Sequence, residues 1–338
     1  MPNPKIQNEN NVIPSKSLFD RVFKKYTWEW ILVVIFILIN IMNSSLSPYY
    51  LDAQSLINST MTFLDKAFLA LSMSLVLVIG FIDISVASTV ALSSVIMAVT
   101  YNAGLPMPLA IVVCLLVGLI CGMINGILLV KFSELAPMIV TLATQIIYRG
   151  IANIILEDQA AGKFPDWFNA LGNKLIGNIP LIMIVFAIFT VFFIILLQRT
   201  KFGRQLYAMG SNMTASKFSG INTDKNIFLV YAINGLMAAI TALFLTSRMT
   251  STRPNIAMSY EMDVIAMVVL GGISTSGGKG RISGVIISVF IIGLLRYGLG
   301  LININAQMLM IIIGALLIAA VAVPEFKSLF NRVKIKRQ

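Results

Sequence analysis

The chain has 338 residues, of which 58% are hydrophobic and only 12% are charged, and its mean hydropathy is +0.89. Soluble globular proteins are about one quarter charged. The composition therefore excludes a fold that hides its apolar surface in an aqueous core, and it predicts an integral membrane protein that uses lipid as its solvent. The sequence contains no histidine, so we expect neither a His-based metal site nor a catalytic triad.

A basic N-terminal segment, residues 1–25, precedes the first apolar run. This order is that of a signal peptide, but no small-residue cleavage site follows the run from Trp30 to Met42, so we expect a retained first helix. The chain ends in a basic tail, residues 324–338. Between these segments we predict one polytopic transmembrane domain, residues 26–323.

Ten apolar segments follow one another within this domain. They lie at residues 26–41, 67–82, 85–99, 108–130, 137–156, 180–198, 227–245, 264–270, 282–295 and 308–323. A helix needs about 20 residues to cross the hydrocarbon, so the short eighth segment is expected to continue through the glycines that follow it. The pattern predicts an all-α membrane protein of about ten helices, some of them broken by glycine.

The basic residues predict the orientation, because lysine and arginine collect in cytoplasmic loops. With a cytoplasmic N-terminus and ten crossings, the inside segments are 1–25, 131–136, 199–226, 277–281 and 324–338. These segments hold 18 of the 25 basic residues. We therefore expect both termini in the cytoplasm, and the net charge of +11 needs no nucleic-acid partner.

The most informative inside segment is residues 199–226, RTKFGRQLYAMGSNMTASKFSGINTDKN. It is amphipathic, and glycines punctuate it, which predicts short helices joined by turns. We expect Gly210 to adopt a positive φ. An exposed apolar side is expected from Leu206, Tyr207, Met209 and Phe218. The segment is either an ordinary loop held at the headgroups or a docking element for a soluble partner.

A second group of glycines lies between the eighth and ninth apolar segments. The structural glycines expected here are Gly271, Gly272, Gly277, Gly278, Gly280 and Gly284. The run does not match a phosphate-binding loop, because Ile273 occupies the position of the first required glycine and Gly280 follows Lys279 where a hydroxyl is needed. We therefore expect no nucleotide on this chain, and we predict a broken helix whose irregular backbone is buried in protein.

Few polar side chains lie within the apolar segments. The candidates for a translocation path are Asp83, Asn125, Thr144, Gln145, Asn153 and Asn305. A membrane-buried amide commonly bonds a neighbouring helix, and a sugar path needs several donors and acceptors, so both roles stay open. Asp83 either caps the helix that follows Ser85 or lines the path, since a charge in hydrocarbon costs about 2.5–3.5 kcal/mol.

The outside segment 157–178 carries an aromatic cluster that includes Phe164, Trp167 and Phe168. Aromatic residues beside a membrane span are typical of the lipid–water interface or of a short helix lying on it. The alternative is a docking surface for an extracytoplasmic partner.

Several runs, in the expected order, give the sequence a family resemblance. They are IDISVAS at 82–88, PMIVTLATQIIYRGI at 137–151, FGRQLYAMGSN at 202–212 with SGI at 219–221, and EMDVIAMVVLGGISTSGGKGRISG at 261–284 with its continuation GLLRYGLGLININ. Together they resemble the permease subunits of the ribose, rhamnose and autoinducer-2 ABC import family. Phe81 and Ala87 stand where that family has glycine, and Phe81 is too large for close helix packing.

The resemblance implies a permease that moves a small sugar or sugar-like molecule across the bacterial inner membrane. It implies a second permease copy or paralogue, an ATP-binding subunit that holds ATP and Mg, and an extracytoplasmic solute-binding protein. The ATPase subunit is expected to bind residues 199–226. The coupling residues that the resemblance carries over are Gly203, Arg204, Gln205, Tyr207, Ala208, Met209, Gly210, Asn212, Ala215, Ser219 and Gly220.

A different transport mechanism is the alternative. An ion-coupled secondary transporter that acts without an ATPase subunit should carry carboxylates within the membrane. This sequence offers Asp83, Glu261 and Asp263, all near the ends of apolar segments. The lack of histidine and of clustered acids within the apolar segments argues against an enzyme, and ATP hydrolysis is expected on a separate subunit.

Overall fold

The computed structural model describes residues 26–157, 159–305, 307–315 and 318. Its helices are α2 (Thr27–Leu46), α3 (Ala53–Ser59), η1 (Thr60–Thr62), α4 (Leu64–Val78), α5 (Val86–Asn102), α6 (Met107–Lys131), α7 (Pro137–Leu156), α8 (Asp166–Leu171), α9 (Leu181–Arg199), α10 (Lys201–Ser211), α11 (Met213–Phe218), α12 (Thr223–Met249), α13 (Tyr260–Leu270) and α14 (Ile282–Leu301). Residues 307–315 are helical as well. The predicted segments 1–25 and 324–338 lie outside the described residues.

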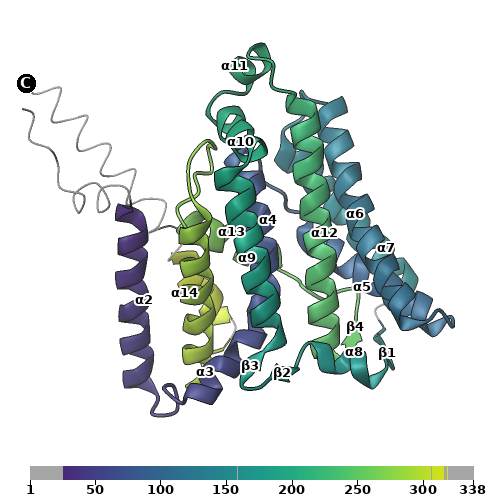
Figure 1. Cartoon of the computed structure of the whole chain (residues 1–338). Helices are drawn as coiled ribbons and strands as arrows, with labels where there is room; N and C mark the ends of the chain where they lie inside the picture. Colours follow the sequence, from purple (N-terminus) through teal and green to yellow (C-terminus); the bar gives the residue numbers. More distant parts are fainter. Residues whose placement is uncertain (1–25, 158, 306, 316–317, 319–338) are drawn as a thin grey trace, which may run out of the picture.

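The long helices stand side by side in a single bundle (Figure 1). Six of the described helices are long and apolar enough to cross a membrane, namely α2, α6, α7, α9, α12 and α14. A seventh span is formed if α3 and η1 join α4 across a bend of 56°. These six or seven candidate spans confirm the prediction of an all-α membrane protein. Two further apolar helices, α5 and α13, have 17 and 11 residues.

The centre of the bundle is built from α4 and α12. Every residue of α4 is buried, and α12 packs against α4, α5 and α6. Lipid gives helices no hydrophobic drive to associate, so close packing depends on small residues. Gly122 of α6 and Gly235 of α12 provide it: a Cβ on Gly235 would lie 2.7 Å from the Gly122 Cα. The two backbones therefore touch.

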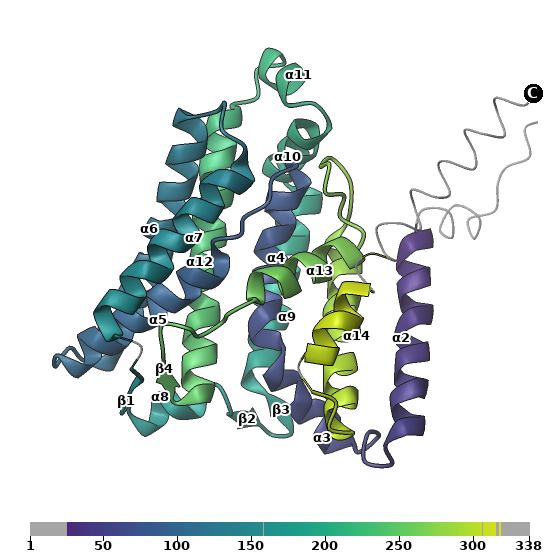
Figure 2. The ribbon, with the colours of Figure 1, turned by 180° about the vertical axis from the view of Figure 1, so that it is seen from behind.

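Elements outside the long helices lie at the two ends of the bundle (Figure 2). The helix pair α10 and α11 lies at one end, whereas α3, α8 and four short strands lie at the other. The strands β1 (Ala161–Gly162) and β4 (Ser251–Thr252) pair antiparallel, as do β2 (Leu175–Ile176) and β3 (Ile179–Pro180). The strand end holds the loop of residues 159–180, and from β4 the chain rises to α13 in the middle of the bundle.

The aromatic cluster of residues 157–178 belongs mostly to the protein interior. Phe164 and Phe168 are buried, and their rings pack against each other at 5.3 Å. Gly172 N donates to Ser247 Oγ at 2.7 Å, which holds the loop against the end of α12. Trp167 remains half exposed. The expected surface belt is therefore limited to this tryptophan, and the phenylalanines anchor the loop.

The eighth apolar segment does not continue through the glycines, contrary to expectation. α13 ends at Leu270, and residues 271–281 form turns before α14 begins. Gly272 and Gly280 have φ values of +87° and +124°, which side chains disfavour, so the helix cannot propagate. Lys279 is exposed. This irregular backbone thus lies at an end of the bundle and is only partly buried, whereas full burial was expected.

Candidate functional site

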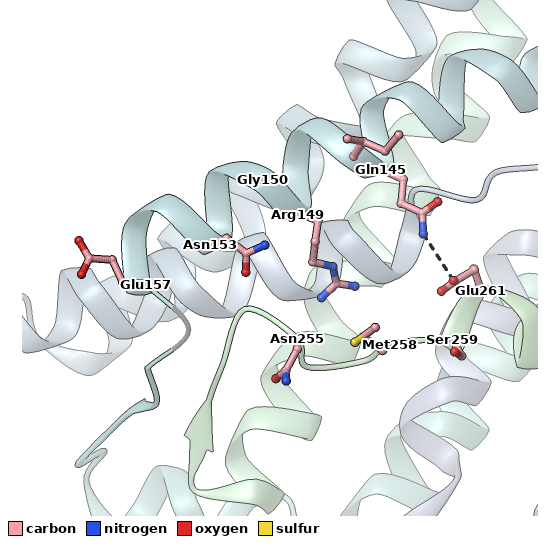
Figure 3. A pocket seen from close by; sticks show the side chains of 10 residues that line it. Gln145, Arg149, Gly150, Asn153, Glu157, Asn255, Met258, Ser259 and Glu261 are labelled. Atoms are coloured by element: carbon pink, nitrogen blue, oxygen red, sulfur yellow. Dashed lines mark hydrogen bonds between the residues drawn. The ribbon is translucent and has the colours of Figure 1, made fainter. Parts of the chain in front are cut away.

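A polar stripe runs along α7. Gln145, Arg149 and Asn153 follow each other at intervals of four residues, which places them on one face of the helix, and Glu157 follows as the left-handed residue that ends α7. In Figure 3 the side chains of Gln145, Arg149 and Asn153 point toward the facing loop and α13, whereas that of Glu157 points away. The neighbouring isoleucines, among them Ile146, are exposed apolar groups. The stripe is therefore a polar strip within an otherwise apolar outer surface.

The stripe forms one wall of a cavity of about 880 Å³. Its opposite wall comes from Asn255 and Met258 of the loop after β4 and from Ser259 and Glu261 at the start of α13 (Figure 3). Amide, hydroxyl and carboxylate groups thus face each other across the space. A small polar molecule of several hydroxyl groups could meet both donors and acceptors here.

Hydrogen bonds connect the two walls. Arg149 Nη1 donates to Pro254 O at 2.5 Å and to Ile256 O at 2.8 Å. Gln145 Nε2 donates to Glu261 Oε1 at 3.4 Å. The second carboxylate oxygen of Glu261 is buried and has no hydrogen-bond partner among the described residues. The guanidinium therefore supports the loop, and the glutamate retains an unused acceptor beside the cavity.

Behind this wall lies a buried ionic cluster. Lys66 Nζ lies 2.6 Å from Asp263 Oδ2, and the Arg296 guanidinium contacts the other oxygen of the same carboxylate. Arg248 Nη2 lies 2.8 Å from Asp65 Oδ2. Charges in a membrane protein need such partners, because desolvation otherwise makes them costly. The cluster joins α4, α12, α13 and α14.

Tyr260 links the two halves of this cluster. The Lys66 ammonium lies 4.2 Å from the centroid of its ring, and the tyrosine hydroxyl donates to Asp65 Oδ2 at 3.4 Å. The cation–π contact and the hydrogen bond hold the first turn of α13. Since Glu261 and Ser259 lie at this turn, the cluster positions one wall of the cavity.

Asp83 lies in a separate network. Its Oδ1 accepts from Ser85 N at 2.9 Å and from Ser85 Oγ at 2.7 Å, and its Oδ2 accepts from Asn234 Nδ2 at 2.8 Å. Asn125 Nδ2 donates to Ser85 Oγ at 2.7 Å, and Tyr148 donates to Asn125 Oδ1 at 3.1 Å. These side chains connect the chain before α5 with α6, α7 and α12. They are the helix-to-helix contacts of buried amides.

The structure divides the predicted path residues among different places. Gln145 and Asn153 both line the cavity. Thr144 is buried and donates to Thr141 O at 3.1 Å within α7. Asn305 Oδ1 accepts from Met308 N at 2.8 Å at the start of the last helix. The cavity also contains Arg149 and Glu261, which the sequence prediction did not place on the path.

The predicted coupling segment forms two short helices, as expected. Thr200 Oγ1 accepts from Gly203 N at 3.2 Å at the start of α10, and Asn212 Oδ1 accepts from Ala215 N at 2.9 Å at the start of α11. Asn222 Oδ1 accepts from Lys225 N at 2.9 Å and caps α12. Three N-caps therefore divide residues 199–226 into successive helices.

The apolar side expected on this segment is only partly exposed. Leu206 and Met209 are buried in the bundle, and Gln205 accepts from Asn226 Nδ2 at 3.3 Å. Phe218 at the end of α11 is 89% exposed. The exposed members of the predicted coupling set are Arg204, Asn212, Ala215, Ser219 and Gly220.

The expected positive φ at Gly210 is wrong. This glycine is helical within α10. The glycine of this segment with a positive φ is Gly220, at +81°. Gly210 is needed because a Cβ there would collide with Val78 O and Gly278 N. The close approach of neighbouring backbones, rather than a turn conformation, therefore excludes a side chain at this position.

Comparison with known proteins gives the family. Residues 55–321 match the family of branched-chain amino acid transport system permease components. The chain is 34% identical to the autoinducer 2 import system permease protein LsrD of Klebsiella pneumoniae, over 88% of this chain and 91% of that protein. The LsrD protein of Yersinia enterocolitica is likewise 34% identical, over 89% of this chain and 92% of that protein.

A third relative, LsrD of Salmonella typhimurium, is 33% identical over 88% of this chain and 92% of its own length. No solved structure matches the chain significantly. The family match spans the bundle from α3 to the last described helix. The chain is thus a multi-pass membrane transport subunit and belongs to this family of ABC transporter permease components.

Proposed function

We propose that this permease imports a small, neutral, sugar-like molecule of the autoinducer-2 type in an ATP-driven system. The observation that carries the proposal is the similarity to LsrD along 88% of the chain. The chemistry of the cavity supports it. Gln145, Asn153, Asn255 and Ser259 offer neutral donors and acceptors that match hydroxyl groups.

The charged groups near the cavity favour a neutral solute over a zwitterion. Arg149 donates to two backbone carbonyls, and Asp65 and Asp263 are each paired with cations. The pairing of Asp65 and Asp263 also weighs against an ion-coupled role for these two carboxylates, which would have to be free to release and rebind an ion. A branched-chain amino acid, which the family description names, is the competing substrate.

The assembly that we propose has further components. A separate ATP-binding subunit holds ATP and Mg and binds the exposed face of α10 and α11. An extracytoplasmic solute-binding protein delivers the substrate, and a second permease copy or paralogue completes the membrane part. The exposed apolar residues on α7, such as Ile146 and Ile154, are available to lipid or to that second permease.

We also infer ten crossings of the bacterial inner membrane with both termini in the cytoplasm. The short helices α5 and α13 then act as spans completed by their non-helical flanks. In support, α10 and residues 277–281, both expected inside, are joined by a hydrogen bond from Tyr207 to Gly280 O.

Uptake measurements test the proposed substrate. Cells that lack this chain should lose uptake of autoinducer-2, and the unmodified chain should restore it. Asn153→Ala and Asn255→Ala should each raise the concentration needed for half-maximal uptake, whereas Asn173→Ala, in an exposed loop outside the cavity, should not. Uptake of leucine in place of autoinducer-2 would contradict the proposed substrate class.

A further inference from the structure

Two glycine-containing turns of the bundle meet at α10. The first turn, residues 79–85, joins α4 to α5, and the second, residues 271–281, joins α13 to α14. Gly278 N donates to Val78 O at 2.8 Å, so the second turn is bonded to the C-terminal end of α4, where the first turn begins. The half-buried Tyr207 of α10 donates its hydroxyl to Gly280 O at 2.7 Å.

Beside the tyrosine hydrogen bond, backbone packs directly on backbone at this place. A Cβ on Gly210 would collide with Val78 O and Gly278 N, and a Cβ on Gly277 would lie only 3.0 Å from Gly210 O. We name the contact among Val78, Tyr207, Gly210, Gly278 and Gly280 the glycine junction. Packed interiors transmit displacement because they have little free volume. A shift of α10 must therefore move both turns.

The first turn leads to one wall of the cavity. Thr141 Oγ1 accepts from Ile84 N and lies near Ile82 O, both at 3.3 Å. Thr141 precedes Gln145 by one turn of α7, so the polar stripe begins directly after this contact.

The second turn leads to the opposite wall. It continues backward into α13, whose 11 residues form a rigid rod about 15 Å long. Glu261 and Ser259 lie at the far end of that rod, beside the cavity. The ionic cluster around Asp263 holds the same end against α4 and α14.

We propose that the glycine junction transmits displacement of α10 to both walls of the cavity, and this inference rests on the proposed ATP-driven function. Tyr207 is then a positioning residue that ties α10 to the second turn. Burial raises the pKa of its phenol, opposed in part by Arg281, so the hydroxyl remains a donor at neutral pH. Tyr207→Phe removes this single contact and retains the ring.

A cysteine-labelling experiment tests the inference without a known substrate. The two native cysteines are buried, so the background is low. Asn153→Cys reports on the cavity, and Asn173→Cys reports on an exposed loop outside it. Each is placed in the full chain, co-purified with its ATPase subunit, and labelled with a small maleimide in the nucleotide-free state and after trapping with ATP and vanadate.

In the otherwise unmodified chain, labelling of Asn153→Cys should change on trapping, and labelling of Asn173→Cys should not. Adding Tyr207→Phe should reduce that change by about fivefold, the factor that one net hydrogen bond contributes. Gly210→Ala should do the same by separating α10 from both turns. Co-purification of the ATPase is measured in parallel for both variants, because both residues belong to the segment expected to bind it.

The outcomes separate the two proposals. If Asn153→Cys does not respond to trapping in the otherwise unmodified chain, the proposed ATP-driven role of the cavity fails, and the inference fails with it. If it responds and Tyr207→Phe and Gly210→Ala leave the response at full size, only the glycine junction is refuted. Loss of the ATPase from both variants would make the junction part of the docking face and would also refute transmission.

Discussion

Replacing Asp263 by Asn should be among the most damaging single changes in the bundle. The carboxylate accepts from Lys66 at 2.6 Å and from Arg296, and its side chain is only 12% exposed. An amide of the same shape leaves two cations in the interior without a counter-charge. Removing one member of a buried ion pair costs about 3–5 kcal/mol, and here both cations lose the same partner. We expect a loss at the upper end of that range.

The assay is equilibrium unfolding in mixed detergent micelles, with Asp52→Asn as the matched control. Asp52 is exposed and caps α3 by accepting from Ser55 N at 2.8 Å. Asparagine caps helices about as well as aspartate, so the control should keep its free energy of unfolding. Lys66→Met should cost less than Asp263→Asn, because Arg296 still neutralises the carboxylate. If Asp263→Asn and the control unfold alike, the cluster does not hold α13 and the reasoning is wrong.

Three further predictions follow from the proposed topology and assembly. A reporter fused after Gln338 should be active only in the cytoplasm, and activity on the other side would exclude ten crossings. The purified chain should neither bind nor hydrolyse ATP, and robust hydrolysis without other subunits would refute that expectation. Arg204→Glu, on the exposed face of α10, should insert normally but fail to co-purify with the ATPase, because charge reversal spoils a complementary docking face; normal binding and transport would make residues 199–226 an ordinary loop.

Hydropathy predicted the long helices because a spanning helix is defined by composition. The segment expected at 137–156 is α7, and the one expected at 108–130 differs from α6 by one residue at each end. The length argument failed at Leu270, where the 20 residues needed for a span suggested that the helix continues, but positive φ values at the following glycines end it. A window of residue types contains no information on where a glycine is forced out of helical geometry.

The cavity was only partly predictable. Gln145 and Asn153 stood out as amides within an apolar segment, but nothing local distinguished them from Thr144, which bonds its own helix. Asp65 and Lys66 were missed because they precede an apolar run and resemble ordinary span-end charges. Their partners Arg248 and Asp263 lie 183 and 197 residues away in sequence. The one local signal available was the four-residue spacing of the polar side chains in α7, which places them on one face of that helix.

Direct reconstitution tests the central claim that this permease imports a sugar-like molecule at the expense of ATP. The chain would be placed in liposomes with its ATPase subunit, a second permease and the solute-binding protein, and uptake of autoinducer-2 would be measured with ATP on the ATPase side. We predict uptake that requires ATP and the binding protein and that persists when ion gradients are collapsed. Uptake that continues without ATP and stops when a proton or sodium gradient is removed would contradict the account.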